Sequence, residues 1–291
     1  MVLYFDVYRT AQFRDYFLRY EMEMFNLIDT KFTENIYNFY MYNLPTLYEV
    51  HEMLEDEESK ATLRSYIKGM VTNSLKYYRY TSAPHYFLQG FLPEEGDIAI
   101  DGGAFDGETA IDFKMQGAKV YSFEMEPNNY KNCLKKAKEY NFVIENLGLS
   151  DKAFESFYYE NTSGSHRVNE DTGLVAKFID LDTYVVEKKI PRVDYIKLDI
   201  EGAELEMLHG AAKTISRWKP KMAVSAYHKP EDILTLPTYI KTIRPDYEFK
   251  LRHYKSSCAK DLLNDEQRKT LIKFGLGYDF ALAGELVLFC K

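Results

Sequence analysis

Short apolar runs alternate with amphipathic segments from about residue 97 to the end of the sequence. The apolar runs predict strands, and the spacing of apolar residues between them predicts helices. The predicted strands cover residues 97–100, 119–124, 142–144, 193–199, 222–228, 247–254 and 284–289. One predicted helix opens near residue 108. Three more cover residues 130–140, 203–215 and 231–243. This alternation predicts an α/β fold with a mostly parallel sheet covered on both faces.

The first 90 residues differ from the rest of the sequence in amino-acid composition. They are rich in Tyr, Phe and Met and contain no glycine before Gly69. Such a segment predicts several helices, with breaks near Asp29 and near Pro45. We therefore expect two domains. We expect residues 1–90 to form a helical segment that caps a binding site or makes a dimer contact, and residues 91–291 to form the sheet domain.

A glycine-rich turn follows the first predicted strand. Residues 101–107 read DGGAFDG and stand between an apolar run and a helix. Glycines let the backbone approach a ligand closely and turn sharply into a helix. Asp101 precedes the glycines, and the G-x-G-x-x-G pattern of dinucleotide sites is missing, so the turn favours a cationic ligand over a pyrophosphate. A tight turn that binds nothing is the alternative.

Further acids follow later strands. Glu124 ends the second predicted strand, at about the 20-residue offset from the first acid at which such folds hold ribose. A carboxylate suits ribose because it accepts two hydrogen bonds from a vicinal diol. Ligands of open parallel sheets bind outside the carboxyl ends of the strands. Asp101, Glu124, Asp199 and His228 all stand at predicted strand ends, and we expect them to converge.

Four blocks of the sequence carry a family resemblance. In order they are IDGGAFDGETA, VYSFEMEPNN, VDYIKLDIEGAELEMLHGA and AVSAYHKPEDI. Together they resemble the FkbM-type S-adenosylmethionine-dependent methyltransferases, over residues 92–291, most specifically in IKLDIEGAE. The resemblance implies a Rossmann-like class I methyltransferase fold with seven strands, the last antiparallel. It also implies O-methylation of a small molecule, often a sugar, glycan precursor or natural product. Phe105 stands where the middle glycine of the methyltransferase motif often lies.

The candidate cofactor-binding residues lie on these turns and strand ends. They are Asp101, Gly102, Gly103, Asp106, Gly107, Thr109, Glu124, Asn128, Ser150 and Asp199. Together they are expected to hold S-adenosylmethionine, with the glycines beside its amino-acid moiety and Glu124 on its ribose.

The catalytic candidates are His228 and Asp199. A sugar hydroxyl needs a group that takes its proton, and a histidine has a pKa near neutrality. His228 is therefore the first candidate for the base, with His166 and His253 as rivals. Asp199 could bind the cofactor's ammonium group, orient the base or ligate Mg²⁺ with Glu201. We do not favour the metal, because the usual paired-acid pattern is not evident.

Composition narrows the choice of partners. The 291 residues carry a net charge of −8, which argues against a general nucleic-acid or anionic-membrane binder. Three cysteines without metal spacing suit a reducing cytoplasm, and no signal peptide or membrane span is visible. The expected partner is a small-molecule acceptor such as a sugar or sugar nucleotide, with a homodimer as a further expectation.

The residues themselves leave two other classes of protein open. A nicotinamide-dependent oxidoreductase would use the acid after the second strand, but the sequence lacks its glycine fingerprint and a fitting Tyr-x-x-x-Lys pair. A non-catalytic binding module could keep the same sheet. Binding of nicotinamide dinucleotides would indicate the first, and binding of the methyl donor without transfer would indicate the second.

Overall fold

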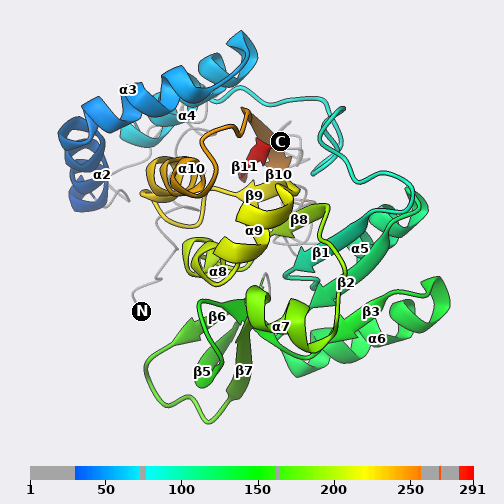
Figure 1. The fold of residues 1–291 in the computed structure, drawn as a ribbon. Helices are drawn as coiled ribbons and strands as arrows, with labels where there is room; N and C mark the ends of the chain where they lie inside the picture. Colours follow the sequence, from blue (N-terminus) through cyan, green and yellow to red (C-terminus); the bar gives the residue numbers. More distant parts are fainter. Residues whose placement is uncertain (1–29, 73–76, 162–163, 257–268, 270–281) are drawn as a thin grey trace. The chain divides into compact units, whose positions relative to one another are not determined.

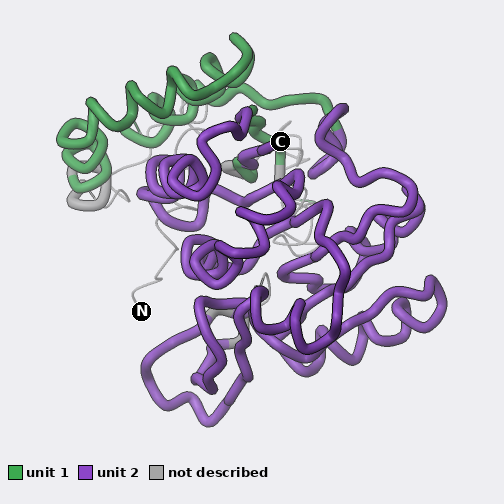
Figure 2. Tube along the Cα trace, in the orientation of Figure 1, with its two compact units in different colours: residues 1–83, 250–286 green, residues 84–249, 287–291 purple. Residues whose placement is uncertain are grey.

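The computed structural model describes residues 30–72, 77–161, 164–256, 269 and 282–291. The chain divides into two compact units, shown in separate colours in Figure 2. Unit 1 comprises residues 1–83 and 250–286, and unit 2 comprises residues 84–249 and 287–291. Compactness alone does not test the predicted division into residues 1–90 and 91–291. That division, and the role of the first part as a cap or dimer contact, stay predictions.

A seven-stranded sheet dominates the fold (Figure 1), in the order β10-β11-β9-β8-β1-β2-β3. Its strands are β1 (Ile98–Gly102), β2 (Lys119–Phe123), β3 (Val143–Glu145), β8 (Tyr195–Leu198), β9 (Lys221–Ser225), β10 (Phe249–Ser256) and β11 (Leu282–Cys290). β1, β2, β3, β8 and β9 are parallel neighbours, and β11 runs antiparallel to β9. This is the Rossmann-like sheet that the sequence predicts, including the antiparallel last strand.

Helices connect the parallel strands of unit 2. They are α5 (Glu108–Met115), α6 (Pro127–Tyr140), α7 (Leu181–Glu187), α8 (Glu204–Gly210), α9 (Ala212–Trp218) and α10 (Asp232–Ile243). α5 and α6 contact each other and the strands β1 to β3, whereas α7 to α10 form a second group that packs together (Figure 1). Every residue of β1 and β8 is buried, as expected for strands covered on both faces.

One predicted helix is wrong in its extent. The sequence predicts a single helix over residues 203–215, but the structure has α8 and α9 with a break at Ala211. Just before the break, Gly210 packs so closely that an added Cβ would overlap the carbonyl oxygen of Ser150. This close approach of backbones places the break, and apolar spacing carries no sign of it.

Aromatic side chains fill the core of unit 2 between sheet and helices. Phe113 of α5 packs edge-on against Tyr195 of β8, with ring centroids 5.0 Å apart. Tyr184 of α7 packs edge-on against Phe123 of β2 at 4.7 Å. All four rings are buried. This packing holds the strand ends in fixed positions relative to one another.

A second, four-stranded sheet in unit 2 was not predicted. Its strands are β4 (Gly148–Ser150), β5 (Phe154–Asn161), β6 (Gly164–Val168) and β7 (Val175–Asp180), in the order β4-β7-β5-β6. No predicted strand lies between residues 144 and 193, where these four strands are. Tyr158 and Phe178 form its small buried core with Ala176. Such a small core leaves only a weak apolar pattern in the sequence.

Unit 1 contains the helices α2 (Thr30–Tyr42), α3 (Leu44–Met53) and α4 (Glu57–Thr72). The predicted helix break near Pro45 is confirmed, since this proline occupies the first turn of α3. Within unit 1, Arg252 of β10 is 6% exposed and donates to Asp56 at 2.9 Å. The helices and this strand are thus joined by a largely buried ion pair.

The last features of the fold are its cysteines and the polarity of its helices. Cys133 and Cys290 are buried free thiols, and Cys258 lies outside the described residues. Across the part of the chain that the structure describes, each helix is too short or too polar to cross a membrane.

Candidate active site

The glycine turn packs directly against the segment that follows β8. Gly103 has a φ of 78°, and an added Cβ there would overlap the backbone carbonyl oxygen of Asp199. The Asp199 amide also donates to the carbonyl oxygen of Gly102 at 3.1 Å. Glycine is required here for both its conformation and its small size. The ends of β1 and β8, the predicted strands 97–100 and 193–199, thus lie together, as the sequence predicts.

Asp101 is fully buried and paired. Its Oδ1 lies 3.3 Å from Lys197 Nζ, and its Oδ2 accepts from Ser122 Oγ at 3.0 Å. The sequence suggested that this carboxylate would face the ammonium group of a cofactor. In the structure it faces the ammonium group of Lys197 instead. Direct contact of Asp101 with a cofactor stays a prediction, and the visible role of Asp101 is to hold Lys197.

Lys197 connects the first acid to the glycine turn. Its ammonium group donates to the carbonyl oxygens of Gly102 at 3.2 Å and Gly103 at 2.7 Å. Burial would lower the pKa of Lys197, but Asp101 and Asp199 outweigh burial and raise it above the ordinary value. Lys197 is therefore charged, and it fixes the orientation of the turn's carbonyl groups.

Glu124 spans from the end of β2 to the same turn. Its Oε2 accepts from the Phe105 amide at 2.9 Å, and its Oε1 accepts from the Glu126 amide at 2.8 Å. Each carboxylate oxygen keeps a second lone pair that a ribose hydroxyl could use. Burial raises the pKa of Glu124 to about 7, against the lowering effect of these two amide hydrogen bonds.

Phe105 occupies an unusual conformation within the turn. Its φ is 48°, in the left-handed region where glycine is favoured, and its side chain is 47% exposed. The family resemblance placed Phe105 where a glycine often lies, and the backbone indeed has a conformation suited to glycine. A bulky residue in this region is uncommon and concentrates at functional sites.

Two tyrosines hold the Asp199 carboxylate at the end of β8. Tyr86 donates to Oδ2 at 2.7 Å, and Tyr227 donates to Oδ1 at 3.3 Å. Burial would raise the pKa of Asp199, but the positive charges of Lys197 and His228 lower it. The side chain remains 25% exposed, so the ionised carboxylate is accessible from solvent.

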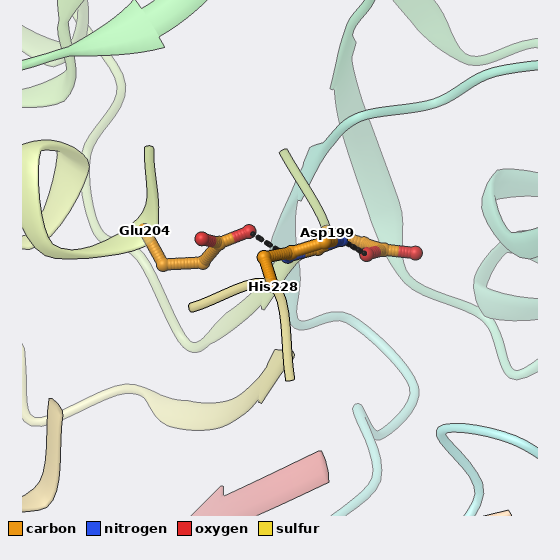
Figure 3. A group of neighbouring side chains, drawn as sticks. All are labelled: Asp199, Glu204 and His228. Carbon is orange, nitrogen blue, oxygen red and sulfur yellow. Dashed lines mark ion pairs between the residues drawn. The ribbon is translucent and has the colours of Figure 1, made fainter. Parts of the chain in front are cut away.

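His228 lies between two acids, as Figure 3 shows. Its Nδ1 is 3.0 Å from Glu204 Oε1, and its Nε2 is 3.4 Å from Asp199 Oδ1. Nε2 also lies 3.6 Å from Glu201 Oε2. Burial would lower the pKa of His228, but these carboxylates outweigh it and raise the pKa to about 10. The sequence-based expectation of a near-neutral pKa is therefore wrong for these surroundings. At neutral pH the raised pKa of His228 favours the imidazolium.

Glu204 is the most buried acid of the group. Its side chain has no exposed area, and its Oε1 accepts from the Ile200 amide at 2.9 Å. Among the described residues, Oε2 has no hydrogen-bond partner. Asp199, Glu204 and His228 each offer a ligand atom, and these three atoms lie within 4.8 Å of one another. The arrangement can hold a proton or a cation between two carboxylates.

Other predicted site residues have partners of their own. Asp106 pairs with Lys136 at 3.2 Å, and Ser150 Oγ donates to Glu206 at 3.1 Å. The amide of Asn128, in the first turn of α6, donates to the cap residue of that helix. Gly107 has a φ of 85° and starts α5, which also contains Thr109. Their roles in cofactor binding stay predictions.

The two rival histidines lie in other parts of the fold. His166 belongs to β6, where its backbone pairs with Tyr159 of β5. His253 belongs to unit 1 and is buried, whereas His228 belongs to unit 2. His228 lies at the end of β9, with Nε2 3.4 Å from Asp199 Oδ1.

Sequence reasoning missed Lys197, Glu204, Tyr86 and Tyr227. A lysine inside an apolar strand is itself a signal, since lysine is rarely buried without a partner. Glu204 sits three residues after Glu201 in the IKLDIEGAE block, which gave no reason to choose between the two acids. Tyr86 precedes the whole sheet in the sequence, so only the fold brings it to Asp199.

Known proteins resemble this chain in sequence and in fold. The hexuronic acid methyltransferase AglP of Haloferax volcanii is 26% identical over 127 residues, which are 42% of this chain and 53% of that protein. The chain thus matches about half of the length of that relative. The crystal structure of methyltransferase FkbM from Methylobacillus flagellatus KT aligns with a TM-score of 0.66 and 24% identity, covering 87% of this chain and 60% of that one.

The alignment with the crystal structure shows that the fold is shared. The sequence profile of the Methyltransferase FkbM domain matches residues 101–251, about half of the chain. The matched region begins at Asp101 and contains Glu124, Asp199 and His228. The chain therefore has the Rossmann-like methyltransferase fold and belongs to the FkbM methyltransferase family.

Proposed function

We propose that this protein transfers the methyl group of S-adenosylmethionine to a hydroxyl group of a sugar acid or a related sugar. The observation that carries the proposal is the direct packing of the Gly103 turn on Asp199. In this proposal the glycine turn binds the methyl donor, and the partly exposed carboxylate of Asp199 beside it binds the acceptor. Membership in a methyltransferase family supports the reaction class.

The donor would bind along the ends of β1 and β2. The glycine turn leaves room for the amino-acid part of the cofactor, and Glu124 would accept hydrogen bonds from its ribose. Lys197 contributes by holding the carbonyl groups of Gly102 and Gly103. In this proposal Asp101 acts mainly through Lys197.

The acceptor would bind at the Asp199 end of the cluster. Asp199 is ionised and partly exposed, so it can align the reacting hydroxyl with the methyl group and take up the hydroxyl proton as the C–O bond forms and S-adenosylhomocysteine leaves. Alignment of two bound reactants supplies a large part of the rate enhancement in such transfers. His228 would balance the charge of Asp199 and orient it, rather than act alone as the base.

The named relative supports the proposed acceptor class. AglP is a hexuronic acid methyltransferase, and the ring hydroxyls of a sugar acid are potential methyl acceptors. We extend that class to this chain as part of the proposal, with oxygen rather than nitrogen as the acceptor atom.

The test is transfer of labelled methyl from S-adenosylmethionine. The full chain is incubated with the labelled donor and with glucuronic acid, galacturonic acid, their nucleotide-linked forms, and the matching neutral and amino sugars. The proposal expects label on a hydroxyl of an acidic sugar, and loss of transfer in Asp199→Asn. Label on an amino sugar alone would overturn the oxygen assignment. Tight donor binding without transfer to any of these sugars would overturn the proposed acceptor class and favour the binding-module alternative.

A further inference from the structure

Around His228, three acids surround one imidazole. Asp199, Glu201 and Glu204 all place a carboxylate oxygen within 3.6 Å of a ring nitrogen. Lys197 also offsets the charge of Asp199, but it is shared with Asp101, so the four carboxylates still exceed the two positive charges of His228 and Lys197. A second cationic charge at this place would be favoured.

Two buried side chains in this cluster have polar atoms without an aligned hydrogen bond to the described residues, although His228 forms ion pairs. Glu204 Oε2 is fully buried and has no hydrogen-bond partner among the described residues. His228 is 9% exposed, and neither ring nitrogen is aligned for a hydrogen bond to the residues that the structure describes. Buried polar atoms without partners are rare in native proteins and call for a ligand, ion or water.

We propose that Asp199, Glu204 and His228 form a binding site for a divalent cation. Their ligand atoms lie within 4.8 Å of one another, and Figure 3 shows the imidazole between the two carboxylates. Metal–ligand bonds of about 2.0–2.2 Å place two ligands of one ion no more than about 4.4 Å apart. Binding of an ion would therefore release the ring proton of His228 and would need side-chain movements that bring the three ligand atoms within this limit.

The donor set selects the class of cation. Two carboxylates alone suit Mg²⁺ or Ca²⁺, but an imidazole nitrogen shifts the preference towards first-row ions such as Mn²⁺ and Zn²⁺. The sequence left open Mg²⁺ on Asp199 with Glu201. The structure instead brings in Glu204, which is fully buried and whose Oε2 has no hydrogen-bond partner among the described residues.

The function of the cation follows from the position of Asp199. An ion beside the exposed edge of this carboxylate would polarise the acceptor's hydroxyl and stabilise the developing negative charge on oxygen. This role rests on the proposed function, whereas binding of the cation does not.

The test measures Mn²⁺ binding by the full chain after treatment with a chelator. Electron paramagnetic resonance reports free Mn²⁺ directly, without donor, acceptor or turnover. The wild type should bind one Mn²⁺ per chain, and Zn²⁺ should compete more strongly than Ca²⁺. Glu204→Gln and His228→Asn should each weaken Mn²⁺ binding by about 10–100-fold.

Glu206→Gln is the matched control, because Glu206 lies on the same helix α8 but pairs with Arg167 at 2.7 Å. It should bind Mn²⁺ like the wild type. Circular dichroism of each variant without metal checks that the fold is kept, and Asp199→Asn replaces any variant that fails this check. Absence of saturable Mn²⁺ binding by the wild type, or equal binding by all variants, would overturn the site. Titration with S-adenosylhomocysteine without metal tests donor binding separately, so the two proposals can fail independently.

Discussion

The ammonium group of Lys197 lies 3.3 Å from the carboxylate of Asp101, and both side chains are buried. The same ammonium group donates to the carbonyl oxygens of Gly102 and Gly103. The buried ion pair thus holds the backbone of the glycine turn in place. A pair of this kind is costly to break, because the partner that is left behind is a charge without solvent.

We therefore predict that Lys197→Met destabilises the protein by about 3–5 kcal/mol, the usual cost of removing one partner of a buried pair. Chemical denaturation followed by circular dichroism measures the loss. The double variant Asp101→Asn with Lys197→Met should recover part of it, since no unpaired charge remains. Additive losses in the two single variants and the double variant would show that the two residues are not coupled.

Gly103 and Gly96 offer a matched pair of substitutions. Both have positive φ, of 78° and 84°, but only Gly103 has a backbone carbonyl where a Cβ would be placed. Gly96→Ala should cost about 1 kcal/mol from strain alone. Gly103→Ala should cost more and should also weaken binding of S-adenosylhomocysteine, because the turn must move away from Asp199. Equal losses of unfolding free energy and intact ligand binding would contradict the close contact.

The sheet and the convergence of its strand ends could be predicted from the sequence. Apolar runs that alternate with helical spacing define a parallel sheet, and the carboxyl ends of parallel strands share one edge. The sequence therefore predicts that Asp101, Glu124, Asp199 and His228 converge at this edge. Its glycines predict a close approach of the turn to a ligand, and in the structure Gly103 closely approaches the backbone of Asp199.

The interior of the site could not be predicted in the same way. Tyr86 reaches Asp199 only because the chain before the sheet folds back, and no local pattern encodes that. Glu204 opens α8 and is fully buried beside His228, whereas Glu201 lies before the helix and is 37% exposed, a difference that the sequence does not encode. The pKa of His228 depends on three carboxylates from the segment after β8, so a residue type at a strand end was not enough to assign its charge.

His228 and His209 provide a test of the proposed chemistry. We predict that His228→Gln lowers methyl transfer by about 10–100-fold while donor affinity changes little, because the variant removes the charged partner that balances and orients Asp199. His209 is exposed on α8 and packs edge-on against Tyr239, outside the cluster around Asp199. His209→Gln should keep wild-type turnover. Initial rates with saturating donor distinguish the two variants, and near-normal turnover of His228→Gln would remove His228 from the mechanism.

His253 in unit 1 should make the stability depend on pH. Burial among tyrosine rings lowers its pKa to about 4, compared with 6.5 for an ordinary histidine. Between these values the unfolded chain binds a proton that the folded chain does not. Its contribution to the free energy of unfolding is therefore fully present above pH 6.5 and is lost as the pH falls towards 4.

His253→Phe keeps a ring of similar shape and removes this titration. The difference in unfolding free energy between wild type and variant should shift against the wild type as the pH is lowered from 7 to about 4.5. Denaturation curves at several pH values measure it. Parallel stability profiles for the two proteins would show that His253 does not titrate in this range.

Calorimetric titration of the full chain with S-adenosylhomocysteine tests the central claim most directly. The account predicts saturable binding at one site per chain, no binding of NAD⁺, and a loss of about 1–3 kcal/mol in Glu124→Ala, because that variant removes the carboxylate proposed to hold the ribose. Failure of the wild type to bind S-adenosylhomocysteine, or wild-type affinity in Glu124→Ala, would contradict the account.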